Sequence, residues 1–222
     1  MVSDIRAKVL KNAVIVGGHP RSGTSLACQL VESAGIEFPS DYDADEYNQA
    51  GYYELEINKK LTKKLLKEAM TVKNTIKMNK IVDKLNNCKK AAGLKIVRIP
   101  AIFFYRHITR NLRSVFIFRN PADVKASQLR RGISRFRPDW FENNNALIAA
   151  HENIEDSIII SYESLIAGRK EVKELFASIG LDIDYSIIDS DERTQKKSRV
   201  VITDKEKELY SRLKDLEEEN LA

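Results

Sequence analysis

The stretch AVIVGGHPRSGTSLACQLVESAG, residues 13–35, decides the fold. It begins with a short continuous apolar run at 13–16, which is typical of a buried parallel strand. A glycine-rich turn follows at 18–25, and the apolar spacing of 26–34 before Gly35 predicts an amphipathic helix with a C-terminal glycine. Strand, tight turn and helix in this order direct backbone N–H groups and the positive end of a helix dipole at one spot. The stretch therefore predicts an anion-binding turn after the first strand.

The turn at 18–25 has the frame of the P-loop, the phosphate-cradling motif G-x-x-x-x-G-K-[ST], but Thr24 stands in the lysine position. The missing lysine disfavours the β,γ-phosphate pair of ATP or GTP as the bound anion, and Arg21 inside the turn is a substitute cation. A strand predicted at 114–118 ends in Arg119, where a P-loop nucleotide hydrolase usually carries the aspartate that holds Mg²⁺. No regularly spaced carboxylate pairs with either arginine, which indicates that both face an anionic ligand.

Strand patterns alternate with helix patterns along the chain. Besides 13–16 and 114–118, apolar runs predict strands at 94–99 and 157–161, and apolar spacing predicts helices that include 169–179 and 204–220. Asn120 and Pro121 form a helix start, whereas 132–145, with three consecutive asparagines, predicts a loop or a broken helix. This order predicts a three-layer α/β sandwich with a central parallel sheet of about four to five strands, P-loop NTPase-like topology and a single domain over residues 1–222.

The composition is that of an ordinary globular domain, with 222 residues, 43% hydrophobic content and a formal net charge of +5. Lysine-rich runs at 59–67 and 73–80 fit solvated helix faces, because aromatic residues are not interleaved with them as a nucleic-acid stacking platform requires. Cys28 and Cys88 have neither metal-ligand spacing nor a disulfide framework, so no metal site is predicted. Residues 1–12 contain no apolar leader and no later stretch suits a membrane span, so we expect a soluble, cytoplasmic protein without nucleic-acid or membrane partners.

Three short motifs resemble those of the sulfotransferases that use 3′-phosphoadenosine 5′-phosphosulfate (PAPS). Residues 20–25, PRSGTS, are similar to the 5′-phosphosulfate loop of that family, and residues 119–127, RNPADVKAS, are similar to its 3′-phosphate motif. Residues 161–165, SYESL, resemble its Tyr-Glu-Asp-Leu stretch, and Arg98-Ile99-Pro100 stands in the place of its Lys-x-Pro element. Leu26 replaces an aromatic residue of the cytosolic members, and their C-terminal Arg-Lys-Gly motif is absent. The resemblance is therefore to the bacterial and carbohydrate-type group rather than to the phenol and steroid type.

The resemblance implies PAPS as co-substrate, no metal cofactor, and a role for each matching residue. Arg21 would reach the bridging oxygen or the sulfuryl group as charge moves onto the leaving phosphate. The residues implied to bind the donor are Ser22, Gly23, Thr24 and Ser25 through their backbone N–H groups at the 5′-phosphate, Arg119 and Ser127 at the 3′-phosphate, and Tyr162 near the adenine.

An acceptor also needs a general base within hydrogen-bond reach. Glu54, in the pattern Asn-x-x-Gly-Tyr-x-Glu at 48–54, is the predicted base, since this pattern resembles a segment of the bacterial and carbohydrate-type members. The alternative is that Glu54 only complements a helix dipole. His19 is predicted to position the backbone or contact substrate, whereas His107 and His151 are predicted to be surface or internally satisfied histidines.

The predicted activity is transfer of a sulfuryl group to a hydroxyl or amine acceptor, such as a carbohydrate or a small molecule. Aromatic residues in the segments 36–60 and 132–150 are expected to bind the acceptor; they are Tyr42, Tyr47, Tyr52, Tyr53, Phe136, Trp140 and Phe141. A basic loop with Arg193, Lys196, Lys197 and Arg199 either closes over the 3′-phosphate or is solvated. Two alternative functions are a P-loop kinase for a small molecule and a catalytically silent nucleotide-binding module.

Overall fold

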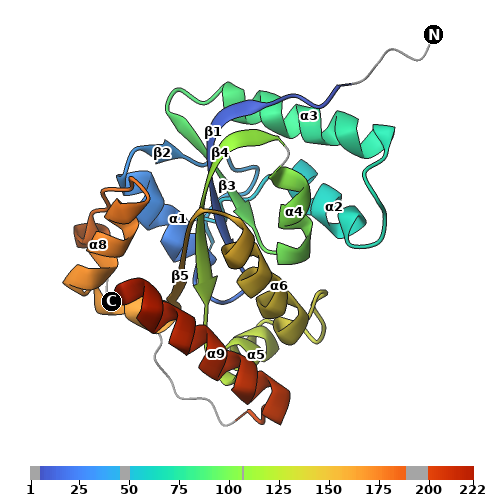
Figure 1. Cartoon of the computed structure of the whole chain (residues 1–222). Coiled ribbons are helices and arrows are strands. Elements are labelled where there is room, and N and C mark those ends of the chain that lie inside the picture. Colours follow the sequence, from blue (N-terminus) through green and yellow to red (C-terminus); the bar gives the residue numbers. More distant parts are fainter. Residues whose placement is uncertain (1–5, 46–50, 107, 189–199) are drawn as a thin grey trace.

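A central parallel sheet forms the middle layer of the molecule (Figure 1). The computed structural model describes residues 6–45, 51–106, 108–188 and 200–222. Its five strands run in the order β2-β3-β1-β4-β5, and each neighbouring pair is parallel. The strands are β1 (Leu10–Gly18), β2 (Ile36–Glu37), β3 (Ala91–Ile96), β4 (Thr109–Phe118) and β5 (Asp156–Ser161). The predicted fold class is confirmed.

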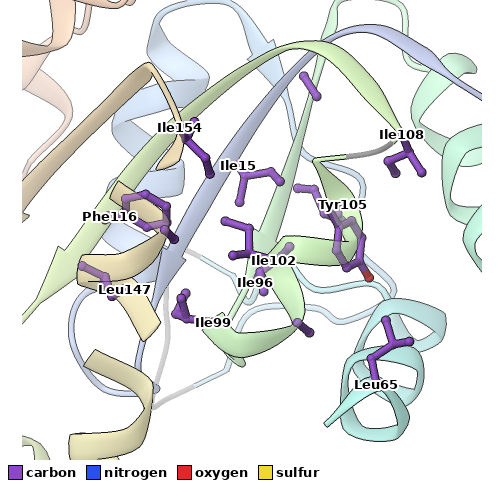
Figure 2. Packing of buried hydrophobic residues seen from close by; sticks show 14 of the residues in the cluster. Ile15, Leu65, Ile96, Ile99, Ile102, Tyr105, Ile108, Phe116, Leu147 and Ile154 are labelled. Atoms are coloured by element: carbon purple, nitrogen blue, oxygen red, sulfur yellow. The ribbon is translucent and has the colours of Figure 1, made fainter. Parts of the chain in front are cut away.

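Helices cover both faces of the sheet. The helices are α1 (Thr24–Ser33), α2 (Glu56–Leu65), α3 (Val72–Asn86), the 3₁₀ turn η1 (Ile99–Ala101), α4 (Ile102–Tyr105), α5 (Pro121–Arg130), α6 (Trp140–Asn153), α7 (Tyr162–Ala167), α8 (Lys170–Ser178), the 3₁₀ turn η2 (Tyr185–Ile187) and α9 (Asp204–Leu221). Side chains of a strand alternate between the two faces, so Val14 and Val16 pack with α1 and α8, whereas Ile15 packs with the helices of the other face. Figure 2 shows Ile15 and Phe116 of the sheet lying with Leu147 of α6 in that second core.

The prediction of a loop or broken helix at 132–145 is wrong for its last part, because α6 begins at Trp140 and contains all three asparagines. Asp139 caps the helix in a capping box with Glu142. The buried Asn143 side chain accepts from the Ile99 N–H at 2.9 Å, which ties α6 to the turn after β3. Asparagine is a poor helix former in isolation, but here tertiary hydrogen bonds override that preference.

Most other boundaries agree with the sequence to within a few residues. The strand predicted at 94–99 lies at Ala91–Ile96, because Pro100 opens a 3₁₀ turn instead of continuing the strand. The two-residue strand β2 was not predicted, since two residues give no periodic signal. Asn120 caps α5 by accepting from the Ala122 N–H at 2.9 Å, as expected from the sequence.

The C-terminal helix α9 packs through Leu209 and Leu213 and carries a buried carboxylate, Glu217. This carboxylate accepts from the N–H and the hydroxyl of Ser161, at 2.7 and 2.8 Å, and pairs with Lys214. Ser161 ends β5 and caps α7, so α9 fixes the point where the chain leaves the sheet after its fifth strand. Within the described part of the chain, no helix combines the length and apolar character needed to cross a bilayer.

Candidate functional site

The carboxyl ends of β1, β4 and β5 lie together at one edge of the sheet, and this edge brings the three predicted motifs into contact. Arg21, in the turn after β1, donates from Nε to Ser127 Oγ on α5 at 3.1 Å. Arg119, directly after β4, places its guanidinium carbon 4.2 Å from the ring centre of Tyr162, which follows β5. Residues 106 positions apart in the sequence are thus hydrogen-bonded at the predicted anion site.

The turn between β1 and α1 is held in an unusual backbone conformation. Arg21 has a φ of +73°, and Gly23, the N-cap of α1, has a φ of +92°. Arginine rarely adopts a left-handed backbone, and such residues persist where the surroundings impose them, most often at functional sites. Among the described residues, no side chain caps α1, so the first turn of the helix directs its N–H groups at the space in front of the loop.

One backbone group assigned to the phosphate is already used within the turn. The Ser22 N–H donates to the His19 carbonyl at 3.1 Å, which closes the loop on itself. The buried Ser22 hydroxyl, by contrast, has no hydrogen-bond partner in the described part of the chain. Ser22 can therefore offer a ligand its hydroxyl but not its backbone N–H. The backbone N–H groups that remain for the phosphate are those of residues 23–25.

Gly23 is required at its position for a steric reason. A Cβ atom at residue 23 would lie 2.4 Å from Cδ2 of Tyr162, closer than real Cβ contacts. The buried Tyr162 ring therefore packs directly against the loop backbone and also contacts the Arg119 guanidinium. Tyr162 is predicted to lie near the adenine. Its ring also contacts both the loop and Arg119, so it helps to position them.

Arg119 has two neighbours that were not predicted. Glu163 Oε1 lies 4.0 Å from Arg119 Nε, so a carboxylate does face this arginine, contrary to the expectation from the sequence. Burial raises the pKa of Glu163, and the positive charge of Arg119 opposes this shift. The buried Trp140 ring, which was expected to bind the acceptor, instead donates from Nε1 to the Arg119 carbonyl at 3.1 Å. Trp140 thus fixes the backbone at the end of β4.

Cations gather around Arg21. Burial lowers the pKa of Arg21, and the neighbouring charges of Arg131, Arg119 and Arg130 lower it further. Asp45 lies 3.9 Å from Arg131, so part of this charge is balanced within the protein, and an anionic ligand would relieve the remaining repulsion. The cluster therefore suits a ligand that carries several negative charges.

Glu54 lies two residues before the start of α2. Its side chain is 17% exposed and its carboxylate lies 3.5 Å from Lys95 Nζ and 3.8 Å from Lys59 Nζ. Its place before α2 is compatible with the dipole role that the sequence left open. Lys95 was missed by the sequence interpretation, and the one signal that pointed to it is a single lysine within the apolar run of β3.

The histidines are placed as follows. His19 is buried, with Nδ1 2.9 Å from the Pro20 carbonyl oxygen and its ring edge-on to Phe136, and burial lowers its pKa to about 4. Its Nε2 has no hydrogen-bond partner among the described residues. His151 contacts Ser157 at the start of β5, at the opposite end of the strand from the site. His107 and the basic residues at 193–199 lie outside the described residues.

Arg98, the counterpart of the Lys-x-Pro lysine, lies between β3 and η1. Its guanidinium carbon lies 4.9 Å from the ring centre of Phe136, so part of the segment 132–150 lies beside this arginine. Burial lowers the pKa of Arg98, and the negative charge of Glu54 opposes this shift. Its Nε and Nη1 are buried and lack partners within the described ranges.

No protein-family model matches the sequence, and no curated protein matches it either. Among solved structures, the sulfotransferase domain of the olefin synthase from Synechococcus PCC 7002 aligns with a TM-score of 0.60 and 14% identity, over 93% of this chain and 96% of that one. The sulfotransferase domain from the curacin biosynthetic pathway aligns with a TM-score of 0.60 and 11% identity, over 93% and 99%. Mouse sulfotransferase SULT7A1, solved with PAP, aligns with a TM-score of 0.52 and 15% identity, over 81% and 62%. The chain therefore has the fold of sulfotransferase domains.

Proposed function

We propose that this protein is a sulfotransferase that transfers the sulfuryl group of PAPS to a hydroxyl or amine of a carbohydrate or another small acceptor. The observation that carries the proposal is the convergence of Arg21, Ser127 and Arg119 at one edge of the sheet. Arg119 stands where a nucleotide hydrolase carries its Mg²⁺-binding aspartate. Arg21 lies in the loop whose lysine position is occupied by Thr24. The fold shared with sulfotransferase domains supports the same assignment.

The side chains of the site fit an anionic adenine nucleotide. Guanidinium groups form strong, charge-assisted hydrogen bonds with phosphate oxygens, and a helix N-terminus adds N–H donors. Ser22 contributes a buried hydroxyl that lacks a hydrogen-bond partner among the described residues, and Gly23 supplies the left-handed backbone that precedes α1. PAPS, when bound, supplies an activated sulfuryl group on its 5′-phosphate. Arg21 then stabilises the negative charge that develops on the oxygen between phosphorus and sulfur.

Glu54 takes the proton of the acceptor in this proposal. As the acceptor oxygen forms its bond to sulfur, its proton passes to a Glu54 carboxylate oxygen, and the bond from sulfur to the phosphate oxygen breaks. Tyr42 and Tyr52 lie with ring centres 6.3 Å apart, in the segment of the chain that also contains Glu54. Partly exposed aromatic rings beside polar groups suit a sugar or another small hydroxyl compound.

The donor can be tested without knowing the acceptor. Titration calorimetry with 3′-phosphoadenosine 5′-phosphate (PAP) is expected to give an affinity at least about tenfold higher than for ADP or ATP, because the 3′-phosphate adds charge-assisted hydrogen bonds. Mg²⁺ is expected to leave PAP binding unchanged. Equal binding of ATP and PAP would overturn the proposal, and Mg²⁺-dependent ATP turnover would indicate the kinase instead. Labelled PAPS with a panel of hydroxyl compounds and amines then identifies the acceptor, and binding without any transfer would indicate a silent module.

Replacing Arg119 by alanine is expected to weaken PAP binding by about 1.5–3 kcal/mol, the range for a hydrogen bond to a charged group. The affinity for adenosine 5′-monophosphate, which has no 3′-phosphate, should change little. Arg169→Ala serves as the control, because this exposed arginine precedes α8 away from the site. Equal losses for both nucleotides, or no loss, would place the 3′-phosphate elsewhere.

A further inference from the structure

Lys95 is a buried lysine at the junction of three segments. Its side chain, on β3 and in register with Val16 of β1, is 4% exposed. Nζ donates to Ser25 Oγ and to the Tyr52 carbonyl, each at 2.8 Å, and lies 3.5 Å from Glu54 Oε1. One ammonium group therefore joins the start of α1 to the segment that carries the predicted base.

Each N–H donor of the buried Lys95 ammonium has an oxygen nearby. An ammonium has three N–H donors, and three oxygens surround Nζ of Lys95. Burial lowers the pKa of Lys95, and the neighbouring Cys28 and Glu54 act in the opposite direction. Replacing a buried charged group by an apolar one of similar volume is often neutral or favourable for folding, so stability alone does not explain a lysine here.

The backbone next to Lys95 is strained. Tyr53 lies between the two residues of its segment that Lys95 contacts, and its φ of +55° is in the left-handed region. Its ring is held edge-on to Phe38 and its hydroxyl by Glu32. Arg21 and Tyr53 are the two non-glycine residues with positive φ in the described chain, and both border the site. Such strain is kept where the positions of neighbouring groups matter.

We propose that Lys95 is a positioning residue that fixes Ser25 of the donor loop and the Glu54 carboxylate in one arrangement. The inference rests on the proposed function. Lys95 links the residues at the 5′-phosphate to the group that accepts the proton, so that the donor and the base keep a constant separation. A second connection follows through Tyr52, whose hydroxyl accepts from Arg131 at 2.7 Å, beside Arg21.

The first test uses binding alone. Lys95→Met, which keeps the length and removes the charge, is expected to weaken PAP binding about three- to tenfold while adenosine 3′-monophosphate binds within about twofold of the wild-type affinity. The difference isolates the 5′-phosphate, which adenosine 3′-monophosphate lacks. Unchanged binding of both nucleotides, or the same loss for both, would overturn the inference. Thermal melting checks that the variant folds, and Lys95→Gln replaces it if it does not.

The second test uses the pH dependence of transfer from PAPS to an acceptor found in the screen. In Lys95→Met, kcat should fall at least about tenfold and the acid side of the pH–rate profile should move to higher pH, because the carboxylate loses a buried cation. The other charged or titratable groups that face Glu54 are Lys59 on α2, Arg98 after β3 and Cys28 on α1. An unmoved profile would leave Lys95 only a structural role.

Lys59→Met is the matched control, since Lys59 lies 3.8 Å from the same carboxylate but is half exposed. Solvent screens exposed pairs, so this variant should keep the wild-type profile. A wild-type protein that binds PAP no better than ADP would overturn the proposed function itself. A wild-type protein that binds PAP and transfers, with a normal Lys95→Met variant, would overturn only the role of Lys95.

Discussion

Replacing Arg21 by alanine is expected to lower kcat about 10²- to 10³-fold, the loss found when one donor to a developing oxyanion is removed. PAP binding should fall much less, because the loop backbone and Arg119 still hold the two phosphates. Alanine disfavours a φ of +73° as arginine does. The exchange therefore removes the guanidinium without changing the backbone strain at residue 21. Single-turnover transfer from labelled PAPS, with calorimetry for PAP, measures both quantities.

Arg130→Ala is the control for the Arg21 prediction. Arg130 is exposed and contributes positive charge at Arg21, whereas Arg21 alone of the two is bonded to Ser127. The control variant should keep kcat within about threefold of the wild type, since exposed charges are screened. If both variants lose the same activity, the general positive field of the site acts on the reaction and Arg21 has no special part in it.

Glu54→Gln is expected to lower transfer about 10²- to 10⁴-fold, the contribution typical of a positioned general base. The exchange preserves size and removes the ability to take a proton, so PAP affinity should stay close to that of the wild type. Initial rates with saturating PAPS, measured across the pH range, test this expectation. Activity that persists would move the base to a histidine or to solvent.

Glu56→Gln separates catalysis from the helix-dipole role that the sequence left open. Glu54 and Glu56 both lie at the N-terminal end of α2, and Glu56 pairs with Lys60 and Tyr42. A dipole effect is modest and shared by both carboxylates, whereas proton transfer belongs to one. Equal losses of activity and stability in the two variants would support the dipole alternative.

Local patterns predicted the fold well where the signal lies in consecutive residues. The first strand, its turn and α1 follow from apolar runs and glycines, and Asn120 followed by Pro121 gives the start of α5. The asparagines of α6 led to the wrong prediction of a loop, because Asn143 forms hydrogen bonds with residues more than 40 positions away. Local propensity contains no information about such partners.

The candidate site likewise contains residues that the sequence predicted and residues that only the folded chain reveals. Arg21, Arg119 and Ser127 were found through motif spacing, but the contact between Arg21 and Ser127 needs the sheet order that sets their strands side by side. Lys95 has no motif around it, and its partners come from segments up to 70 residues away. A buried cation is recognised by its surroundings, which only the folded chain provides.

The hydrogen bonds between Glu217 and Ser161 make the site depend on both ends of the described chain. Tyr162, which packs against the loop after β1, directly follows a serine held by the last helix, so the seating of α9 helps to position this side of the proposed nucleotide site. Removal of the Glu217 carboxylate is therefore expected to weaken nucleotide binding although Glu217 lies on a helix outside the three motifs. For protein engineering, a tag or fusion beyond residue 222 that displaces α9 is expected to weaken donor binding.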